Sequence, residues 1–304
     1  MSSSTAKIFK RPKSQAEISE LAEWLLHEAD AVNVLPTPLE DLIEFARVKE
    51  VPALPNPNQS FLQKLSLNSQ KIFKTGYQKI RGMADLRERV NYVPINGRKP
   101  RNRFARGHEL GHQVMKWHQI DGGYLDRDKE LSPDIQDVFE SEANFFSSEV
   151  IFQGKRFKTK ARDFTSSFGA MFKLADEHEA SYQATIWRFV EEQDETIAVA
   201  YYYPISFYDN FGQKTLKFWK LIPSPKFRKR YGDLVIPDKI TSNHPWVAAR
   251  TVGFGKIVDG VENLTCGNKP VSFAWEAWWN SYALFVLIRR KPALRIIRTI
   301  SRHG

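Results

Sequence analysis

Apolar residues recur at every third or fourth position along much of the first two thirds of the chain. Between Ala16 and Ala31 this spacing puts them on one face, which predicts an amphipathic helix. Ser181 is the expected N-cap of a later helix of the same kind. In all, this periodicity predicts helices over residues 16–31, 39–46, about 101–118, 134–152, about 168–177 and 181–192, and strand-forming runs over 78–86 and 89–95 predict a hairpin before the third helix.

After Thr196 the pattern changes to short aromatic and β-branched runs separated by Pro and Gly. These runs, at 197–203, 215–222, 274–279 and 282–288, predict a small β-rich domain. We therefore expect an α+β protein in four parts. They are a disordered basic tail (1–14), a mixed helix-and-strand domain (15–160), a helical pair resembling a helix-turn-helix (161–195) and a basic β-rich domain of unknown role (196–304).

Composition narrows the expected compartment and partners. The chain has no run of 18 apolar residues, and Met1–Lys13 lacks the apolar stretch of a signal peptide, so we expect a cytoplasmic protein with no membrane partner. A single cysteine, Cys266, excludes an internal disulfide and a cysteine-ligated zinc. The formal net charge of +10 is concentrated after residue 195. That excess favours an acidic partner or a nucleic acid, with a solvated basic face as the alternative.

The segment His108-Glu109-Leu110-Gly111-His112 is an H-E-x-x-H pattern. On a helix, residues four apart share a face, so both imidazoles can reach one Zn²⁺. Glu109 then lies beside the metal, where it can take a proton from an attacking water. The pattern therefore indicates a zinc hydrolase with His108 and His112 as ligands and Glu109 as general base. Mn²⁺ and Fe²⁺ suit the same ligands less well.

A catalytic zinc needs a third protein ligand and leaves one position for water. His118 has the spacing of the third ligand in metzincins, but Met115 stands where that pattern needs Gly, so we expect the helix to continue and carry His118 away. Glu140 and Glu142 lie about 200° apart around the next helix, so only one can face the metal. Asn144 shares a face with Glu140. We therefore choose Glu140 as the ligand, with Asn144 orienting a ligating histidine, and expect Glu142 to touch only solvent.

These segments resemble the ImmA/IrrE family of zinc metallopeptidases. The match runs from Arg103 to His112 and through residues 140–149, where the family pattern is E-x-E-A-N/D-x-F-A-x-E. Ser147 replaces the usual Ala of that pattern, Arg106 stands where a small or apolar residue is more common, and Val150-Ile151-Phe152-Gln153 replaces Leu-Leu-Met-Pro. The resemblance covers about residues 15–193, and some family members carry an additional C-terminal sensory domain.

The resemblance implies a gluzincin-like peptidase lobe over 15–160, with a small β-sheet and active-site helices. It also implies a regulatory zinc endopeptidase that cleaves a helix-turn-helix transcriptional repressor in response to stress or mobile-element signals. The competing hypothesis is a DNA- or protein-binding regulator that uses zinc without turnover. Against it stand the intact Glu109, which a purely structural zinc site does not need, and the presence of one cation in 181–192.

Three weaker candidates remain from the sequence. Tyr124 and His178 are polar groups available to stabilise an oxyanion, without a spacing argument for either. The strand 89–95 offers an edge that can pair with an extended peptide. The run Lys226-Phe227-Arg228-Lys229-Arg230-Tyr231 and the cationic tail from Arg289 to Arg302 offer surfaces for an acidic partner or a nucleic acid.

Overall fold

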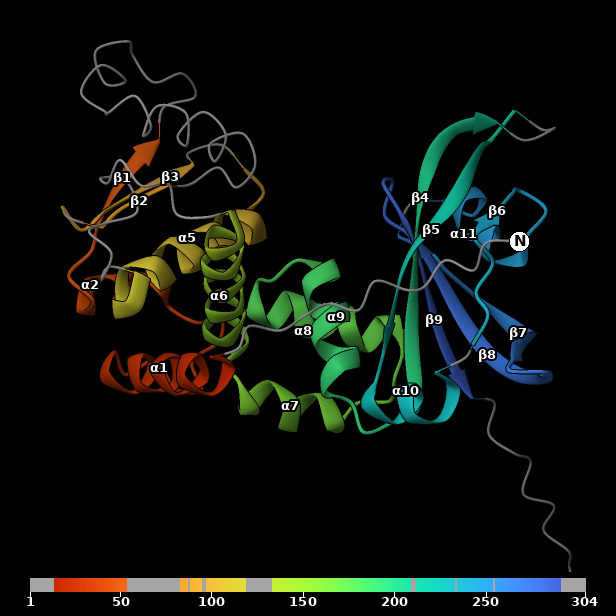
Figure 1. The fold of residues 1–304 in the computed structure, drawn as a ribbon, viewed down its shortest axis with the longest axis horizontal. Helices are drawn as coiled ribbons and strands as arrows, with labels where there is room; N and C mark the ends of the chain where they lie inside the picture. The colour runs from red at the N-terminus through yellow and green to blue at the C-terminus, as the bar shows by residue number, and fades with distance from the viewer. Residues whose placement is uncertain are drawn as a thin grey trace, which may run out of the picture. The chain divides into compact units, whose positions relative to one another are not determined.

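The computed structural model is an α+β protein (Figure 1). It describes residues 14–53, 83–86, 88–94, 97–118, 133–208, 212–232, 234–253 and 255–290. Residues 1–13 of the tail expected over 1–14, Tyr124, and the cationic stretch after Arg290 lie outside these residues. Two compact units divide the described chain, and we call them the N-terminal and C-terminal units. The first ends at Phe164 and also takes Met171–Thr185, whereas the second consists of Thr165–Ala170 and the chain from Ile186 onward.

A three-stranded sheet in the order β1-β3-β2 forms one part of the N-terminal unit. Its strands are β1 (Lys49–Ala53), β2 (Met83–Asp85) and β3 (Val90–Pro94). The expected hairpin is present, because β2 pairs antiparallel with β3. The expected free edge on β3 is wrong: β1 pairs with β3 in parallel register from Lys49–Val90 onward, so β3 is the central strand. From Val90 to Tyr92 its backbone therefore pairs with strands on both sides and is not available to an extended peptide.

Helices make up the rest of this unit, and its apolar core joins the faces of α1, α2, α5 and α6. An additional helix, α7, lies between the expected ones. The apolar residues of the first helix are buried as the spacing requires, with Ile18, Ala22, Leu25 and Leu26 all at or below 1% exposure. The bounds are α1 Gln15–Glu28, α2 Leu39–Phe45, α5 Lys99–Val114, η1 Lys116–His118, α6 Pro133–Phe152, α7 Lys155–Arg162, α8 Phe168–His178 and α9 Tyr182–Glu192. The start of α8 (168–170) and the part of α9 from residue 186 onward belong to the C-terminal unit.

Two glycines one turn apart let α5 and α6 approach closely where they cross (Figure 1). A Cβ at Gly107 would lie 2.6 Å from the Ser147 hydroxyl oxygen, and one at Gly111 would lie 3.0 Å from the Phe146 ring. Both distances are as short as, or shorter than, the closest contacts that a Cβ atom makes. Larger residues at these positions would therefore push the helices apart. The crossing matters because α5 carries the H-E-x-x-H pattern and α6 carries Glu140.

The helix expected over 101–118 is shorter than that. It ends at Val114, Met115 takes an extended conformation (φ −76°, ψ 98°), and a short 3-10 turn ends at His118. Met115 is fully buried in the core that includes α1 and α6. Burial of that side chain therefore outweighs its preference for a helix, and the chain turns back one turn after His112.

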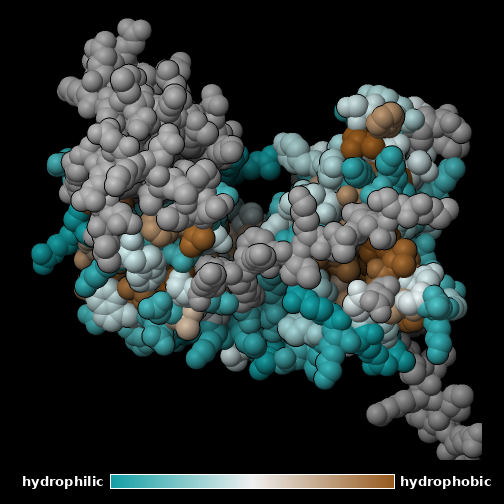
Figure 2. Space-filling model, viewed as in Figure 1, coloured by the Kyte–Doolittle hydropathy of each residue, from teal (hydrophilic) through white to brown (hydrophobic). Residues whose placement is uncertain are grey.

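The C-terminal unit is built on a six-stranded antiparallel sheet in the order β6-β5-β4-β9-β8-β7. Its core gathers one sheet face with α10, η2 and α11, and includes the fully buried Trp246 and Tyr202. Figure 2 shows hydrophobic residues interrupting the hydrophilic surface of this unit. Its exposed aromatic side chains include Phe207, Tyr208 and Tyr282. The bounds are β4 Ile197–Tyr208, β5 Lys214–Pro223, α10 Pro225–Tyr231, β6 Lys239–Ile240, η2 Pro245–Val247, α11 Ala248–Thr251, β7 Ile257–Cys266, β8 Lys269–Trp279 and β9 Leu284–Arg290.

The mixed basic and aromatic run at 226–231 forms α10. Its aromatic residues, Phe227 and Tyr231, are buried in the core at 0% and 7% exposure, so they are not available to stack on bases. The cations between them remain exposed. Within the described ranges, no helix combines the length and apolarity needed to cross a bilayer.

Candidate metal centre

Three side chains that can act as metal ligands converge where α5 crosses α6. His108 and His112 face each other from successive turns of α5, with their Nε2 atoms 3.2 Å apart. Glu140 reaches them from α6, with one carboxylate oxygen 3.3 Å from His108 Nε2 and the other 3.6 Å from His112 Nε2. Among the described residues, this trio is the group of His, Cys, Asp and Glu side chains that can hold a metal ion.

The spacing of these atoms fits a zinc ion. Ligand bonds of 2.0–2.2 Å in a tetrahedron place neighbouring ligand atoms roughly 3.4 Å apart. The two histidine nitrogens are 3.2 Å apart, and each lies 3.3 or 3.6 Å from a different oxygen of Glu140, so the separations are close to that value. Both histidines are almost fully buried, at 1% and 6% exposure. Two imidazole nitrogens and a carboxylate that point at one another are a donor set suited to a cation.

Asn144 orients the first histidine. It lies one turn after Glu140 on α6, and its Oδ1 is 3.1 Å from His108 Nδ1. An amide oxygen only accepts, so His108 Nδ1 carries the proton and donates it to Asn144. The lone pair of His108 is then on Nε2, the atom that faces Glu140 and His112. This is the arrangement that a histidine ligand needs.

The expectation that Glu142 touches only solvent is wrong. Glu142 is 4% exposed and accepts hydrogen bonds from Ser14 Oγ (2.7 Å), Trp117 Nε1 (2.7 Å) and His118 Nε2 (3.0 Å). The angular argument separating it from Glu140 holds, but its side of α6 faces the segment that follows α5. His118 is also not carried away from the site, because its Nδ1 lies 3.0 Å from His112 Nδ1.

Glu109 lies between the two histidines on α5 and is 3% exposed. Burial raises the pKa of its carboxyl to about 7, with the charge on Glu140 adding to the rise and His108 opposing it. A pKa near neutrality suits a group that takes up and releases a proton in one reaction cycle. The structure thus places a carboxyl of suitable acidity next to the candidate ligands.

The pKa values of the three candidate ligands are shifted in different directions. Burial lowers the pKa of His112 to about 4, and the neighbouring His108 adds to that effect. Burial also opposes a charge on His108, but Glu140 and Glu109 outweigh it and raise the pKa of that imidazole. Burial opposes a charge on Glu140, but the neighbouring His112 and His108 outweigh it and hold the pKa of that carboxyl well below its usual range. The site therefore favours a carboxylate at Glu140 and a neutral, metal-ready imidazole at His112.

No protein-family model matches the chain, and no curated protein matches it either. Its fold resembles a solved structure described as a Mycobacterium tuberculosis transcriptional regulator. The two share 13% sequence identity with a TM-score of 0.50, and the match covers 90% of this chain and 76% of the other. At that identity the likeness concerns the fold alone.

Residues that depart from the ImmA/IrrE pattern make specific contacts within the N-terminal unit. Arg106 donates to Glu50 and Glu40, which ties α5 to β1 and α2. Ser147 donates its hydroxyl to the Phe104 carbonyl at 2.8 Å, across the helix crossing. Gln153 follows α6 with a positive φ of 52°, and its side chain binds the loop after α1 by accepting from Asn33 N and donating to the carbonyls of Ala31 and Val34. Each replacement thus makes contacts that a small or apolar residue cannot.

His178, the remaining oxyanion candidate, belongs to the core. It is 1% exposed, donates from Nδ1 to the Leu174 carbonyl at 2.9 Å, and packs against Phe152 and Phe157. Burial lowers its pKa. These contacts explain the residue as a packed, neutral histidine.

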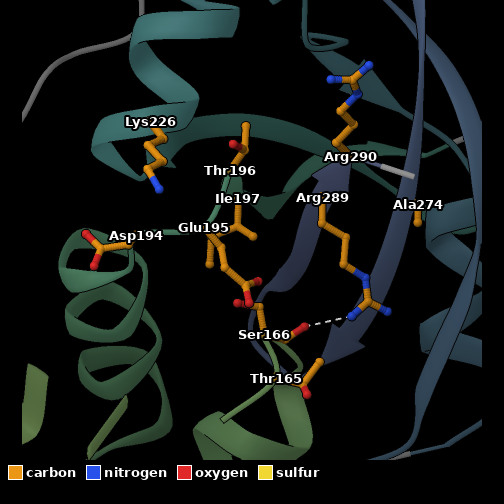
Figure 3. Close-up of a pocket in the computed structure, with 10 residues that line it drawn as sticks. All are labelled: Thr165, Ser166, Asp194, Glu195, Thr196, Ile197, Lys226, Ala274, Arg289 and Arg290. Atoms are coloured by element: carbon orange, nitrogen blue, oxygen red, sulfur yellow. Dashed lines mark hydrogen bonds between the residues drawn. The ribbon is translucent and has the colours of Figure 1, made fainter. Parts of the chain in front are cut away.

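A concavity of about 620 Å³ lies in the C-terminal unit where β4 begins and β9 ends (Figure 3). Its most prominent cation, Arg289, points to the Ser166 carbonyl at 2.7 Å and also binds Glu276, so it serves to fasten the start of α8 to the sheet. Lys226 and Arg290 share the remaining wall with the carboxylates of residues 194 and 195. The lining of this concavity therefore carries charges of both signs and does not favour a ligand of one particular charge.

Proposed function

We propose that this protein is a zinc-dependent endopeptidase. The observation that carries the proposal is the buried set of His108, His112 and Glu140, at separations that suit tetrahedral zinc, with Glu109 beside it. Three protein ligands leave a fourth position open, which is the arrangement of catalytic and not structural zinc sites. A gluzincin-like peptidase lobe over residues 15–160 is the finer assignment that goes with this function.

Each side chain has a distinct task in the proposed reaction. His108, His112 and Glu140 hold the metal, and Asn144 keeps the first of these histidines oriented. A bound Zn²⁺ supplies a Lewis acid that acidifies a water and polarises a peptide carbonyl. A carboxylate oxygen of Glu109 takes the proton from the attacking water and then transfers it to the nitrogen of the leaving amine. One peptide bond and one water thus become a carboxylic acid and an amine.

The proposed substrate is a helix-turn-helix transcriptional repressor. Support comes from the resemblance of residues 103–112 and 140–149 to ImmA/IrrE peptidases, and the fold likeness to a protein named as a transcriptional regulator is compatible with a role in gene regulation. Cleavage of such a repressor would change transcription without any contact between this chain and DNA.

The competing function, a regulator that binds DNA through its own helical pair, receives less support. The second helix of that pair, α9, has one cation, Arg188. Arg188 is 7% exposed and lies 3.4 Å from Glu192, so α9 presents no exposed cation to a phosphate. The exposed cations of α10 leave open an acidic protein or nucleic-acid partner at the C-terminal unit, as a proposal separate from the peptidase site.

The direct test is to co-express this protein with helix-turn-helix repressors encoded by neighbouring genes. Cleavage of the repressors is then compared between wild type and Glu109→Gln. We expect Glu109→Gln to keep its zinc and to lose cleavage by about 10²–10⁴-fold, the usual contribution of a general base. Glu44→Gln, which alters an exposed carboxylate on α2, is the matched control and should cleave normally. Undiminished cleavage in Glu109→Gln would rule out the hydrolytic role, and loss of zinc in that variant would make Glu109 a structural part of the site.

A further inference from the structure

The turn that follows α5 places His118 beside His112, at the ring nitrogen that faces away from His108 and Glu140. His118 is 2% exposed, its backbone N–H donates to the Met115 carbonyl at 2.9 Å, and its ring stacks on Phe139 of α6 at a centroid distance of 4.2 Å. These contacts fix both the position and the plane of the imidazole. His118 is not one of the three converging ligands, so its fixed position needs another explanation.

A chain of hydrogen bonds joins Glu142 to the candidate centre through this ring. Glu142 Oε2 is 3.0 Å from His118 Nε2, and His118 Nδ1 is 3.0 Å from His112 Nδ1. The opposite nitrogen of His112, Nε2, faces His108 and Glu140. The carboxylate, the two rings and the metal position therefore lie in series.

The donors and acceptors along this series allow one arrangement of protons when each ring carries a single proton. Glu142 as a carboxylate only accepts, so His118 Nε2 must donate and His118 Nδ1 must hold the lone pair. That lone pair accepts from His112 Nδ1–H. His112 then has its own lone pair on Nε2, which points at the metal position. The charge of Glu142 thereby selects the tautomer of His112, although the ring of His118 lies between them.

We propose that His118 and Glu142 form a positioning relay that holds His112 in its metal-binding tautomer and raises its affinity for the metal. This inference rests on the proposed zinc centre. It also predicts an asymmetry between the two histidine ligands, because His108 is oriented by a neutral amide, Asn144, whereas His112 is oriented by a carboxylate acting through a ring. A negative charge behind a ligating histidine makes its metal-binding nitrogen more basic.

The alternative is that Glu142 serves only as a packing anchor. It accepts from Ser14 and Trp117 as well as from His118, so its removal disturbs three contacts. Two variants break the relay in different ways: Glu142→Gln keeps the shape but removes the charge, and His118→Phe keeps an aromatic ring against Phe139 but removes both nitrogens. Two control variants, Ser14→Ala and Trp117→Phe, remove the other hydrogen bonds to the same carboxylate and leave the relay intact.

The test measures zinc affinity by competition with a chromophoric chelator, with circular dichroism to confirm folding. We expect Glu142→Gln and His118→Phe to weaken zinc binding by about 10–100-fold, the usual cost of losing the partner behind a metal ligand, and the two controls to change it by less than about threefold. Equal affinity in wild type and Glu142→Gln would overturn the relay. An equal loss in the controls and the relay variants would overturn it too, because the carboxylate would then act as an anchor.

A second measurement separates the relay from the proposed function. In metal-free protein, ¹⁵N chemical shifts of the imidazoles report which nitrogen of His112 carries the proton. We expect the proton on Nδ1 in wild type and a mixed population in His118→Phe. If wild type binds no zinc, the proposed function fails, and these shifts still decide the relay: an unchanged His112 tautomer in His118→Phe would overturn it.

Discussion

Glu109 should make the metal-free protein less stable as the pH rises, and Glu109→Gln should remove that penalty. The carboxyl is buried, with a pKa raised from an ordinary value of 4.5 to about 7. In the unfolded chain it loses its proton near pH 4.5, whereas the folded protein holds the proton until about pH 7. Between these two pH values the folded state keeps a proton that the unfolded chain has lost. The part of the folding stability that depends on this proton is therefore fully present below pH 4.5 and is lost as the pH rises through 7.

The size of the effect follows from that interval. Each pH unit between the two pKa values costs the folded state about 1.4 kcal/mol, so an interval of roughly 2.5 units amounts to about 3 kcal/mol. Because the side chain is buried, no discount for solvent screening applies. Glutamine does not titrate and has nearly the same shape. Glu109→Gln should therefore gain about 3 kcal/mol relative to wild type between pH 4.5 and pH 8.

The assay is urea unfolding of chelator-treated wild type and Glu109→Gln at several pH values across that range, with Glu44→Gln as the control for an exposed carboxylate. Added Zn²⁺ should flatten the slope of the wild type, because a nearby dication favours the charged carboxylate. If the difference in free energy of unfolding between wild type and Glu109→Gln stays constant from pH 4.5 to 8, the reasoning is refuted. The pKa of the Glu109 carboxyl would then be the same in the folded and the unfolded protein.

Three further outcomes are expected. Purified protein should bind about one zinc per chain and the His108→Ala/His112→Ala double variant none, as measured by atomic absorption, and near-stoichiometric zinc in the double variant would exclude the site. Glu140→Ala should weaken zinc binding more than Glu142→Ala, because Glu140 lies at the metal position and Glu142 acts through His118; the reverse order in a titration would contradict the ligand assignment. Gln153→Ala should lower the free energy of unfolding by about 3 kcal/mol through the loss of its buried hydrogen bonds, whereas Gln153→Gly should recover about 1 kcal/mol of that because its φ is positive; equal losses would argue against backbone strain.

Spacing along the chain was enough to predict the parts of the centre that depend on helical geometry. His108 and His112 share a face because they are four residues apart, and the same rule places Asn144 with Glu140 on α6. The return of His118 could not be predicted, because it depends on burial of Met115 in a core contributed by other helices. Local propensity describes one segment at a time and contains no information about that core.

The strands missed by the pattern show the same limit. β1 contains Pro52 and two charged residues and has no apolar alternation, and it becomes a strand by pairing with β3. β7 lies at the edge of its sheet, and only one of its side chains, Leu264, is buried, so it has a weak hydrophobic signature. Gly260 within it interrupts the pattern further, because Trp275 packs where its Cβ would be, at 2.6 Å. These strands depend on neighbours that are distant in sequence.

The contact of α5 and α6 at Gly107 and Gly111 means that the ligands are held by helix packing that involves no metal. Small metal-dependent domains behave differently, since their chains fold only when the ion is present. In this protein the entropy of bringing the three candidate ligands together is included in the folding of the helices, so loading of the proposed centre with metal would be a local event. A chelator should therefore yield a folded apoprotein that can be reloaded, and under the proposed function the metal supply would control activity without loss of the protein.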